Sequence, residues 1–184
     1  CSTFANGQFN GWSCDSVTTC GAFGKVCGGY GVKGKGAEIV KTFTSLTPGQ
    51  AYTVSLDFIQ IDSWDREHAY IDVNGARCKT ISNLRYDTGS NNKCGNVNSG
   101  WKESKHFVFC RATPQGSTLR VRVWTSLNED STNEAFAIDN VAVHKITFAN
   151  FDDGQFDGWS CGSVTTCGAF GKVCGGYGVK GKGA

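Results

Sequence analysis

Two short acidic runs hold most of the side chains in this sequence that could do chemistry. The first, at residues 62–67, directly follows an alternating apolar stretch, and the second, at residues 129–134, follows another. Hard divalent cations such as calcium take about six to eight oxygen ligands from carboxylates and loop carbonyls. If the two runs converge in space, they form a calcium site. The candidate metal ligands are Asp62, Asp65, Glu67, Asp130, Glu134 and Asp139.

Two other interpretations of these carboxylates stay open. The runs could be solvated loop faces, salt-bridged through the arginine within the first run. A pair such as Asp62 and Asp130 could also serve a glycoside hydrolase, but that chemistry needs a defined separation between two carboxyl groups, which sequence does not specify. The histidines His68, His106 and His144 are each flanked by strand-like residues, which favours core or surface positions over a triad base. We therefore expect no enzyme activity.

Exposed aromatic rings beside polar loops would indicate carbohydrate binding. Trp12 and Trp64 are expected in the core, because a large aromatic side chain at a strand end usually buries most of its area. The remaining candidates for carbohydrate binding are Trp101, Trp124 and Tyr30. Trp101 and Trp124 are the better candidates for exposure. Trp124 shares one face of a strand-like segment with Arg120 and Arg122, and this face could bind a ligand or contact another module.

Cysteine is the strongest compositional signal, with 10 in the chain. No C-x-x-C pair occurs, which argues against zinc. An even and dispersed set indicates disulfides formed in an oxidising compartment, so we expect a secreted, extracellular protein. The disulfide candidates are Cys14, Cys20, Cys27, Cys78, Cys94, Cys110, Cys161, Cys167 and Cys174.

The positions of these cysteines restrict their pairing. Three of them lie at residues 14–27, and three lie at residues 78–110. If all six pair within one module, an odd number of bridges must join the two groups. A further three lie at residues 161–174. These three cannot all pair among themselves, so at least one must bond elsewhere or stay free.

The chain contains its own beginning twice. Residues 154–184 repeat residues 7–37 with two differences, Asp157 for Asn10 and Gly162 for Asp15. We expect a complete module at residues 1–147 and the opening part of a second repeat at residues 148–184. A module of this length is large enough to bury its own core, and the connection is too short for a flexible linker.

Residues 38–148 read as a series of short strands. The segment 51–61 alternates apolar and polar residues, as does 119–127, and Asn74-Gly75 between two such segments is a strong hairpin signal. No segment has convincing helical periodicity. We therefore predict an all-β fold, an antiparallel β-sandwich or jelly roll stabilised by disulfides. The expected strands are 51–61, 68–73, 76–80, 105–111, 119–127 and 135–148.

Charge and hydropathy exclude two kinds of partner. The formal net charge is only +2, which gives no reason to expect binding to nucleic acid or to an anionic membrane surface. No apolar run approaches the roughly 18 residues of a membrane span. We expect neither nucleic-acid binding nor membrane insertion.

The order of motifs along the chain resembles galactose-binding-like β-sandwich modules, which recur in secreted and surface proteins of protists. The most specific parts are DSWDRE at residues 62–67 and SLNEDSTNEAFAIDN at residues 126–140. The resemblance implies a structural calcium that ties the start of the domain to its last strand, with Asp139 or residues 6–10 as candidate ligands besides the two acidic runs. It also implies a Cys20–Cys94 disulfide, whereas the other cysteines are additional to the pattern.

Two functions follow as hypotheses. The near-identical copies favour a structural repeat unit of an extracellular fibre or surface filament, which self-associates head to tail through the duplicated segment. The alternative is a calcium-dependent, lectin-like module that binds glycans and gains avidity by repetition.

Overall fold

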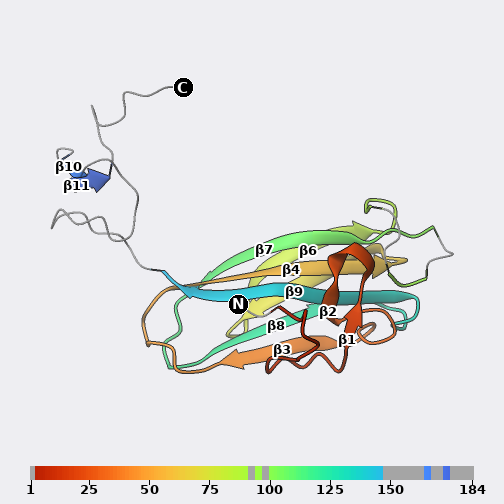
Figure 1. Cartoon of the computed structure of the whole chain (residues 1–184), viewed down its shortest axis with the longest axis horizontal. Coiled ribbons are helices and arrows are strands. Elements are labelled where there is room, and N and C mark those ends of the chain that lie inside the picture. The colour runs from red at the N-terminus through yellow and green to blue at the C-terminus, as the bar shows by residue number, and fades with distance from the viewer. Residues whose placement is uncertain (1–2, 91–93, 97–99, 147–163, 167–171, 175–184) are drawn as a thin grey trace. The chain divides into compact units, whose positions relative to one another are not determined.

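Two antiparallel sheets pack face to face in the first part of the chain (Figure 1). The computed structural model describes residues 3–90, 94–96, 100–146, 164–166 and 172–174. One sheet has the strand order β1-β2-β9-β4-β7, and the other has the order β3-β8-β5-β6. The five-stranded sheet consists of β1 (Val17–Thr19), β2 (Lys25–Gly28), β9 (Glu134–Lys145), β4 (Tyr52–Asp62) and β7 (Ser104–Ala112). The four-stranded sheet consists of β3 (Glu38–Phe43), β8 (Leu119–Thr125), β5 (Asp65–Val73) and β6 (Ala76–Arg85).

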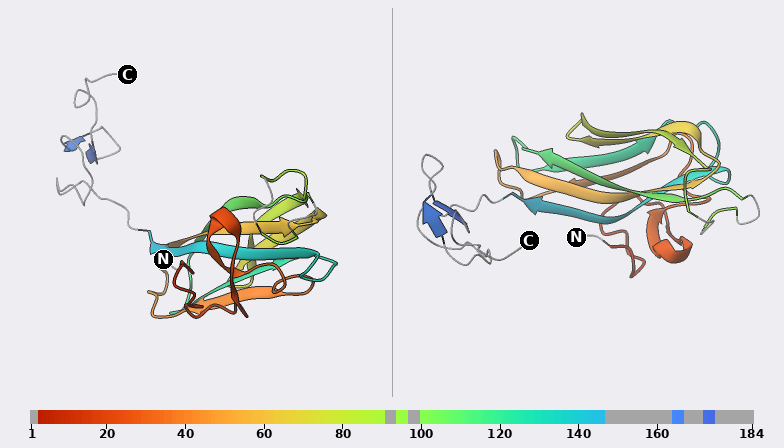
Figure 2. Two further views of the ribbon diagram at one scale, coloured as in Figure 1. Left: turned by 45° about the vertical axis from the view of Figure 1, so that its right-hand side comes forward. Right: turned by 90° about the horizontal axis from the view of Figure 1, so that it is seen from above.

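This architecture confirms the predicted β-sandwich. Each of the six predicted strands is present, and the described residues include no helix beyond the 3₁₀ turn η1 (Gly21–Phe23). In β8 the buried apolar residues are Leu119, Val121 and Val123, as the alternation of the sequence predicts. They pack against side chains of the facing sheet in one hydrophobic core. Figure 2 shows the two sheets as separate layers.

The turn between β5 and β6 is the predicted hairpin. Asn74 has a φ of 50° and Gly75 a φ of 79°. A two-residue turn with positive φ at both positions matches the twist of the flanking strands.

The opening segment of the chain covers the outer face of the five-stranded sheet, which the strand pattern alone did not predict. In β4 the residues Ile59 and Ile61 face away from the main core, yet both are fully buried. They belong to a second cluster together with Cys20, Val26 and Cys94. Both faces of β4 are therefore buried at this end, because η1 and β2 lie over it (Figure 1).

Three disulfides tie this arrangement together. Cys14–Cys27 lies within the opening segment, Cys20–Cys94 joins that segment to the rest of the module, and Cys78–Cys110 links edge strands β6 and β7 of the two sheets. One bridge out of the three crosses between the groups, an odd number as expected. The Cys20–Cys94 pair that the resemblance implied is confirmed.

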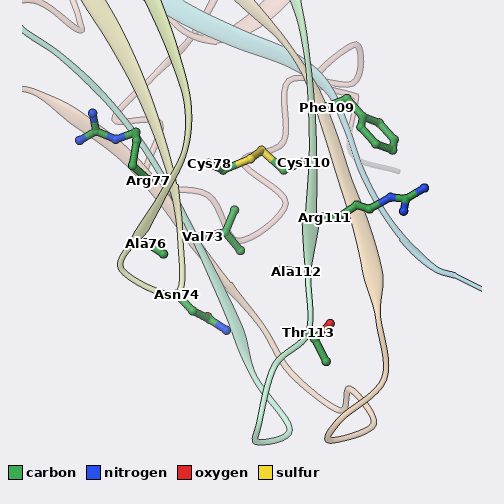
Figure 3. A pocket seen from close by; sticks show the side chains of 10 residues that line it. All are labelled: Val73, Asn74, Ala76, Arg77, Cys78, Phe109, Cys110, Arg111, Ala112 and Thr113. Carbon is green, nitrogen blue, oxygen red and sulfur yellow. A yellow bond between two sulfur atoms is a disulfide. The ribbon is translucent and has the colours of Figure 1, made fainter.

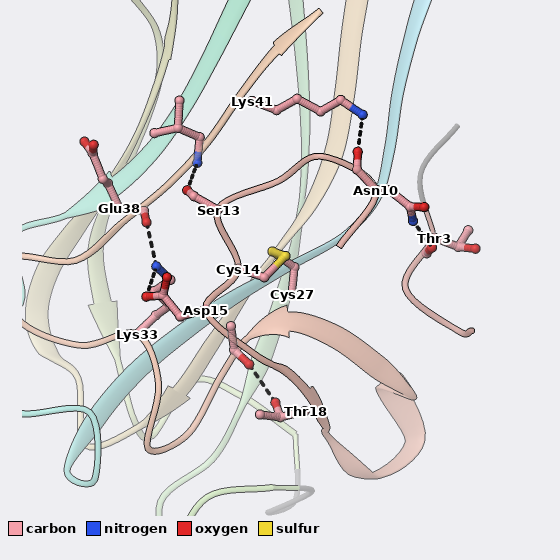
Figure 4. The surroundings of a disulfide bond; sticks show 12 residues. Thr3, Asn10, Ser13, Cys14, Asp15, Thr18, Cys27, Lys33, Glu38 and Lys41 are labelled. Atoms are coloured by element: carbon pink, nitrogen blue, oxygen red, sulfur yellow. Dashed lines mark hydrogen bonds and ion pairs between the residues drawn. A yellow bond between two sulfur atoms is a disulfide. The ribbon is translucent and has the colours of Figure 1, made fainter. Parts of the chain in front are cut away.

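Polar contacts around Cys14–Cys27 attach the opening segment to β3 (Figure 4). The Lys33 ammonium donates to Asp15 Oδ2 at 2.5 Å and to the Glu38 carbonyl at 2.9 Å. The backbone N–H of Val40 donates to Ser13 Oγ at 2.8 Å. These contacts connect residues near the first disulfide to the four-stranded sheet, so the segment touches both sheets.

The second part of the chain, Thr147–Ala184, forms a separate compact unit. Its described residues are β10 (Val164–Thr166) and β11 (Lys172–Cys174), which pair in the register Val164↔Cys174. This register corresponds to Val17↔Cys27 in the pairing of β1 with β2. Cys161 and Cys167, predicted to form disulfides, lie outside the described residues.

The two positions that differ between the copies share a backbone property. In the first copy Asn10 has a φ of 52° and Asp15 a φ of 60°. The copy has Asp157 and Gly162 there, and Asp and Gly are among the few residue types that tolerate positive φ. Both substitutions are thus compatible with the backbone of the first copy.

No helix in the described part of the chain has the length and apolar composition that crossing a membrane requires.

The disulfides should differ in their contribution to stability. Cys20–Cys94 spans 74 residues and Cys14–Cys27 spans 13. The longer loop restricts the unfolded chain more, so the double variant C20A/C94A should lose about 4 kcal/mol and C14A/C27A about 3 kcal/mol. Guanidinium denaturation of both variants measures this difference. A larger loss in C14A/C27A would contradict it.

Candidate functional site

The open face of the four-stranded sheet carries a cross-strand group of aromatic and charged side chains. Trp124 on β8 lies between Glu38 on β3 and Tyr70 on β5 in the strand register. The rings of Tyr70 and Trp124 are 4.4 Å apart between centroids and are tilted by 38°. Both side chains are half-buried. We call the group the aromatic platform; its members are Glu38, Tyr70, Asp72, Arg77, Arg122 and Trp124.

Asp72 is the centre of the platform's hydrogen bonds. Its Oδ2 accepts the indole N–H of Trp124 at 2.7 Å, and its Oδ1 accepts Nε–H of Arg77 at 2.5 Å. The Arg77 guanidinium lies 4.2 Å from the Tyr70 ring centroid and 5.1 Å from that of Trp124. On the other side Arg122 lies 4.8 Å from the Trp124 ring and donates through Nε to Glu38. The two rings are thus held between two arginines.

The charge on Asp72 is well stabilised. Burial of its carboxyl group opposes ionisation, but the hydrogen bonds from Arg77 and Trp124 and the charges of Arg77 and Arg122 outweigh burial and lower its pKa. Asp72 therefore stays ionised throughout the neutral and mildly acidic range. A carboxylate that is fixed in this way holds the indole and one guanidinium in place before any ligand arrives.

The structure separates the three residues predicted to bind carbohydrate. Trp124 is in the platform, whereas Tyr30 packs against the second core cluster on the outer face of the five-stranded sheet. Trp101 is half-buried in the connection before β7. Trp12 and Trp64 are 3% and 0% exposed, so their predicted core positions are confirmed.

Sequence reasoning placed Arg122 on the same face as Trp124, but it missed the other members of the platform. Tyr70 and Asp72 alternate with buried Ala69 and Ile71 in β5, so the alternation of the sequence places them on the outer face. Their proximity to Trp124 depends on β5 pairing with β8. Because residues 70 and 124 are far apart in the chain, no local pattern reveals this pairing.

A groove of about 550 Å³ lies at the open edge between the two sheets. The Cys78–Cys110 disulfide and Val73 line it, and Figure 3 shows Arg77 on one side, and Phe109 and Arg111 on the other, directed away from it. Arg77 belongs to both the groove and the platform. Asn74 and Thr113 add polar side chains to its lining, whereas the aromatic ring pair lies only in the platform.

The two predicted acidic runs converge at the end of the sandwich where β5 and β9 begin. One carboxylate oxygen from each of Asp65, Glu67 and Glu134 lies within 4.8 Å of the others. Asp65 and Glu67 begin β5, and Glu134 begins β9. The indole N–H of Trp64 donates to the Ala135 carbonyl at 2.9 Å and holds the two strand starts together. We call Asp65, Glu67 and Glu134 the acidic cluster.

The other three predicted metal ligands have different surroundings. Asp62 is fully buried and accepts the backbone N–H of Asn96 at 2.9 Å, so it anchors the turn after Cys94. Asp130 is exposed, and its Oδ1 accepts the backbone N–H of Thr132 at 2.9 Å. Burial raises the pKa of both Asp62 and Asp139.

Asp139 lies opposite Asp57 in the strand register. The ammonium group of Lys105 is 3.2 Å from Asp57 Oδ2, and Asn140 donates to the same oxygen at 2.8 Å. A lysine therefore supplies positive charge beside the carboxylate for which the family resemblance implies calcium.

Comparisons with known proteins support the fold. No protein-family model matches the sequence, and no curated protein matches it. The CBM22-1 xylan-binding domain of Xyn10C from Paenibacillus barcinonensis has a TM-score of 0.50 and 13% identity over 80% of this chain and 93% of that chain. The CBM22-1–CBM22-2 tandem domain of the same protein has a TM-score of 0.52 and 12% identity over 89% of this chain and 47% of the tandem chain. The shared feature is the β-sandwich of carbohydrate-binding modules, as the galactose-binding-like resemblance implied.

The pKa of Glu134 gives the module a pH-dependent stability. Burial, together with the charges of Glu67 and Glu129, raises this pKa from 4.5 to about 7. The folded protein therefore binds a proton that the unfolded chain has already lost between these pH values. The free energy of unfolding should fall as the pH rises from about 4.5 to about 7.

The variant E134Q tests this cause. Urea denaturation in EDTA should show that the stability of the wild type relative to E134Q falls by about 3 kcal/mol between pH 4.5 and pH 8, at about 1.4 kcal/mol per pKa unit. Using the difference between the two proteins removes the contribution of other titrating groups. If the difference in the free energy of unfolding between the two proteins does not change with pH, the pKa of Glu134 is not raised in the folded protein.

Proposed function

We propose that the module is a non-catalytic carbohydrate-binding domain and that the aromatic platform is its binding surface. The observation that carries the proposal is the Tyr70–Trp124 ring pair, half-exposed on an open sheet face and surrounded by fixed charged groups. Sugar rings present apolar C–H faces and polar hydroxyl edges. In the platform, aromatic rings that can contact the C–H faces lie beside side chains that can form hydrogen bonds with the hydroxyl groups.

The polar members of the platform match hydroxyl groups. Arg77 and Arg122 each use Nε for a carboxylate of the platform, which leaves donors on their terminal nitrogens for a ligand. Glu38 and Asp72 are acceptors whose positions the same contacts hold. Because these groups are arranged before binding, little conformational entropy is lost when a ligand binds.

One of the structurally similar domains is known to bind a polysaccharide, which supports this proposal. The domain that resembles this fold over 93% of its own length is described as xylan-binding. Xylan is therefore the first polysaccharide to test, although the low identity transfers no ligand by itself. The three disulfides also favour an extracellular setting, where polysaccharides are available.

Repetition of the module would increase its affinity for a polymer. Residues 154–184 repeat the opening segment, and β10 pairs with β11 in the register of β1 with β2. We propose that this segment belongs to a second module of the same kind. Linked modules on one polysaccharide chain convert the second binding event into an intramolecular one.

Substitution of the platform rings should weaken binding. Y70A and W124A should each weaken binding to soluble xylan, or to another polysaccharide that the wild type retains, by more than about tenfold, which corresponds to about 1.4 kcal/mol. Affinity electrophoresis over a panel of polysaccharides, followed by calorimetry, measures the change. Y70F should bind nearly as well as the wild type, because it keeps the ring.

F107A is the matched control, because Phe107 is 70% exposed on β7 of the other sheet. It should leave binding unchanged, and thermal melting should show all variants folded. Loss of binding in F107A with normal binding in Y70A would place the site on the five-stranded sheet. If the wild type binds none of the polysaccharides and no sugar on a glycan array, the proposal is wrong.

Assembly into a fibre stays a prediction that the repeat motivates. A structural repeat unit would self-associate, so light scattering coupled to size exclusion should detect oligomers that grow with concentration, and electron microscopy should show filaments. If the chain is a monomer at every concentration, the prediction of head-to-tail assembly is wrong.

A further inference from the structure

The acidic cluster is an unusual arrangement because its charges are close together and uncompensated. Asp65, Glu67 and Glu134 bring three oxygens within 4.8 Å of one another. Among the described residues, no lysine or arginine forms a salt bridge with any of the three. Glu129 adds a fourth negative charge nearby. The platform is the opposite case, since each of its carboxylates is paired with an arginine.

Glu134 provides a second observation, which is independent of the grouping. Its side chain is 2% exposed, and its Oε2 has no hydrogen-bond partner in the described structure. Buried carboxylate oxygens are normally hydrogen-bonded, paired with a cation or bound to a metal ion. The backbone N–H of Asp65 donates to Glu67 at 2.6 Å, so the neighbouring carboxylate is held in position. The Glu134 carboxylate is part of the same group, and its Oε2 has no donor in the described structure.

We propose that Asp65, Glu67 and Glu134 bind a calcium ion that links the start of β5 to the start of β9. The donor set consists of carboxylate oxygens without nitrogen or sulfur, which suits a hard divalent cation, and calcium accepts irregular oxygen sites more readily than magnesium. The ion supplies the partner that Glu134 Oε2 lacks and neutralises the repulsion.

This site lies in the acidic runs that the sequence analysis singled out, and it differs from the Asp139 position that the family resemblance adds to them. That site would involve Asp139, which lies in the middle of β9 opposite Asp57, and its Oδ1 is also buried without a hydrogen-bond partner in the described structure. Lys105 forms an ion pair with Asp57 there, so a positive charge is already present, whereas no lysine or arginine among the described residues pairs with the acidic cluster. The acidic cluster instead joins the DSWDRE segment to the last strand at its first residue. Its existence does not depend on glycan binding.

Terbium luminescence of the whole chain tests the proposal directly. Terbium substitutes for calcium at oxygen sites, and Trp64, adjacent to Asp65 in the chain, serves as the energy donor. The wild type should show sensitised emission that calcium displaces. Calcium at about 100 times its Kd should raise the Tm by about 5 to 10 °C relative to EDTA.

Variants of the cluster separate binding from folding. E134Q and E67Q should lose the sensitised emission and the calcium-induced Tm shift. At pH 8, where Glu134 is ionised, E134Q in EDTA should melt no lower than the wild type in EDTA, because removing a charge relieves repulsion. D130N is the matched control: it removes a carboxylate of the same loop region that lies outside the cluster, and it should keep both signals.

Three results would overturn the proposal. The first is a wild type whose Tm does not respond to calcium. The second is an E134Q variant that responds as the wild type does. The third is loss of the response in D139N with an intact response in E134Q, which would move the ion to the position implied by the family resemblance.

Discussion

The burial of Trp64 between the two sheets is the constraint on which both ends of the module depend. Its ring is fully buried and packs edge-on against Phe58, and its indole N–H is bonded to β9. Trp64 lies between β4 of one sheet and β5 of the other, so the chain changes sheets at this residue. Moving the ring would cost core packing as well as a buried hydrogen bond, and such combined losses are among the largest that a single residue can cause. The buried position of Trp64 therefore fixes the direction in which β5 runs from the end of β4.

That direction has consequences along the whole of β5. At its start, Asp65 and Glu67 are placed beside Glu134. Further along, Tyr70 and Asp72 are placed beside Trp124 and Arg122 on the open face. One strand thus carries two groups of charged side chains with different electrostatic character. In the platform every carboxylate is neutralised by an arginine, which produces rigid and preorganised geometry. In the acidic cluster the carboxylates face each other, which leaves an attraction for a cation from outside the chain.

The opening segment plays a structural role that explains its cysteines. It covers buried Ile59 and Ile61 on the outer face of β4, and Cys20–Cys94 attaches it to the connection between β6 and β7. The short strands β1 and β2 would form a marginal hairpin alone. They are stabilised by the sheet that they extend, by Cys14–Cys27 and by the contacts of Lys33. The near-identical copy at residues 154–184 carries the same cysteines and lysine, and it differs at two positions with positive φ in the first copy, where only a few residue types are favoured.

The sequence by itself determined the fold class, the strand positions and the odd number of crossing disulfides, because these depend on alternation of apolar residues, turn chemistry and counting. It also placed Trp64 in the core and singled out Trp124, Asp65, Glu67 and Glu134. The tertiary structure decided which of these residues meet. Trp124 lies beside Tyr70 and Asp72 because β8 pairs with β5. Asp62 is not part of the acidic cluster, and its carboxylate accepts a hydrogen bond from the backbone N–H of Asn96 instead. Such neighbours come from segments dozens of residues apart, and strand pairing over that distance is set by the packing of the whole core rather than by any local pattern.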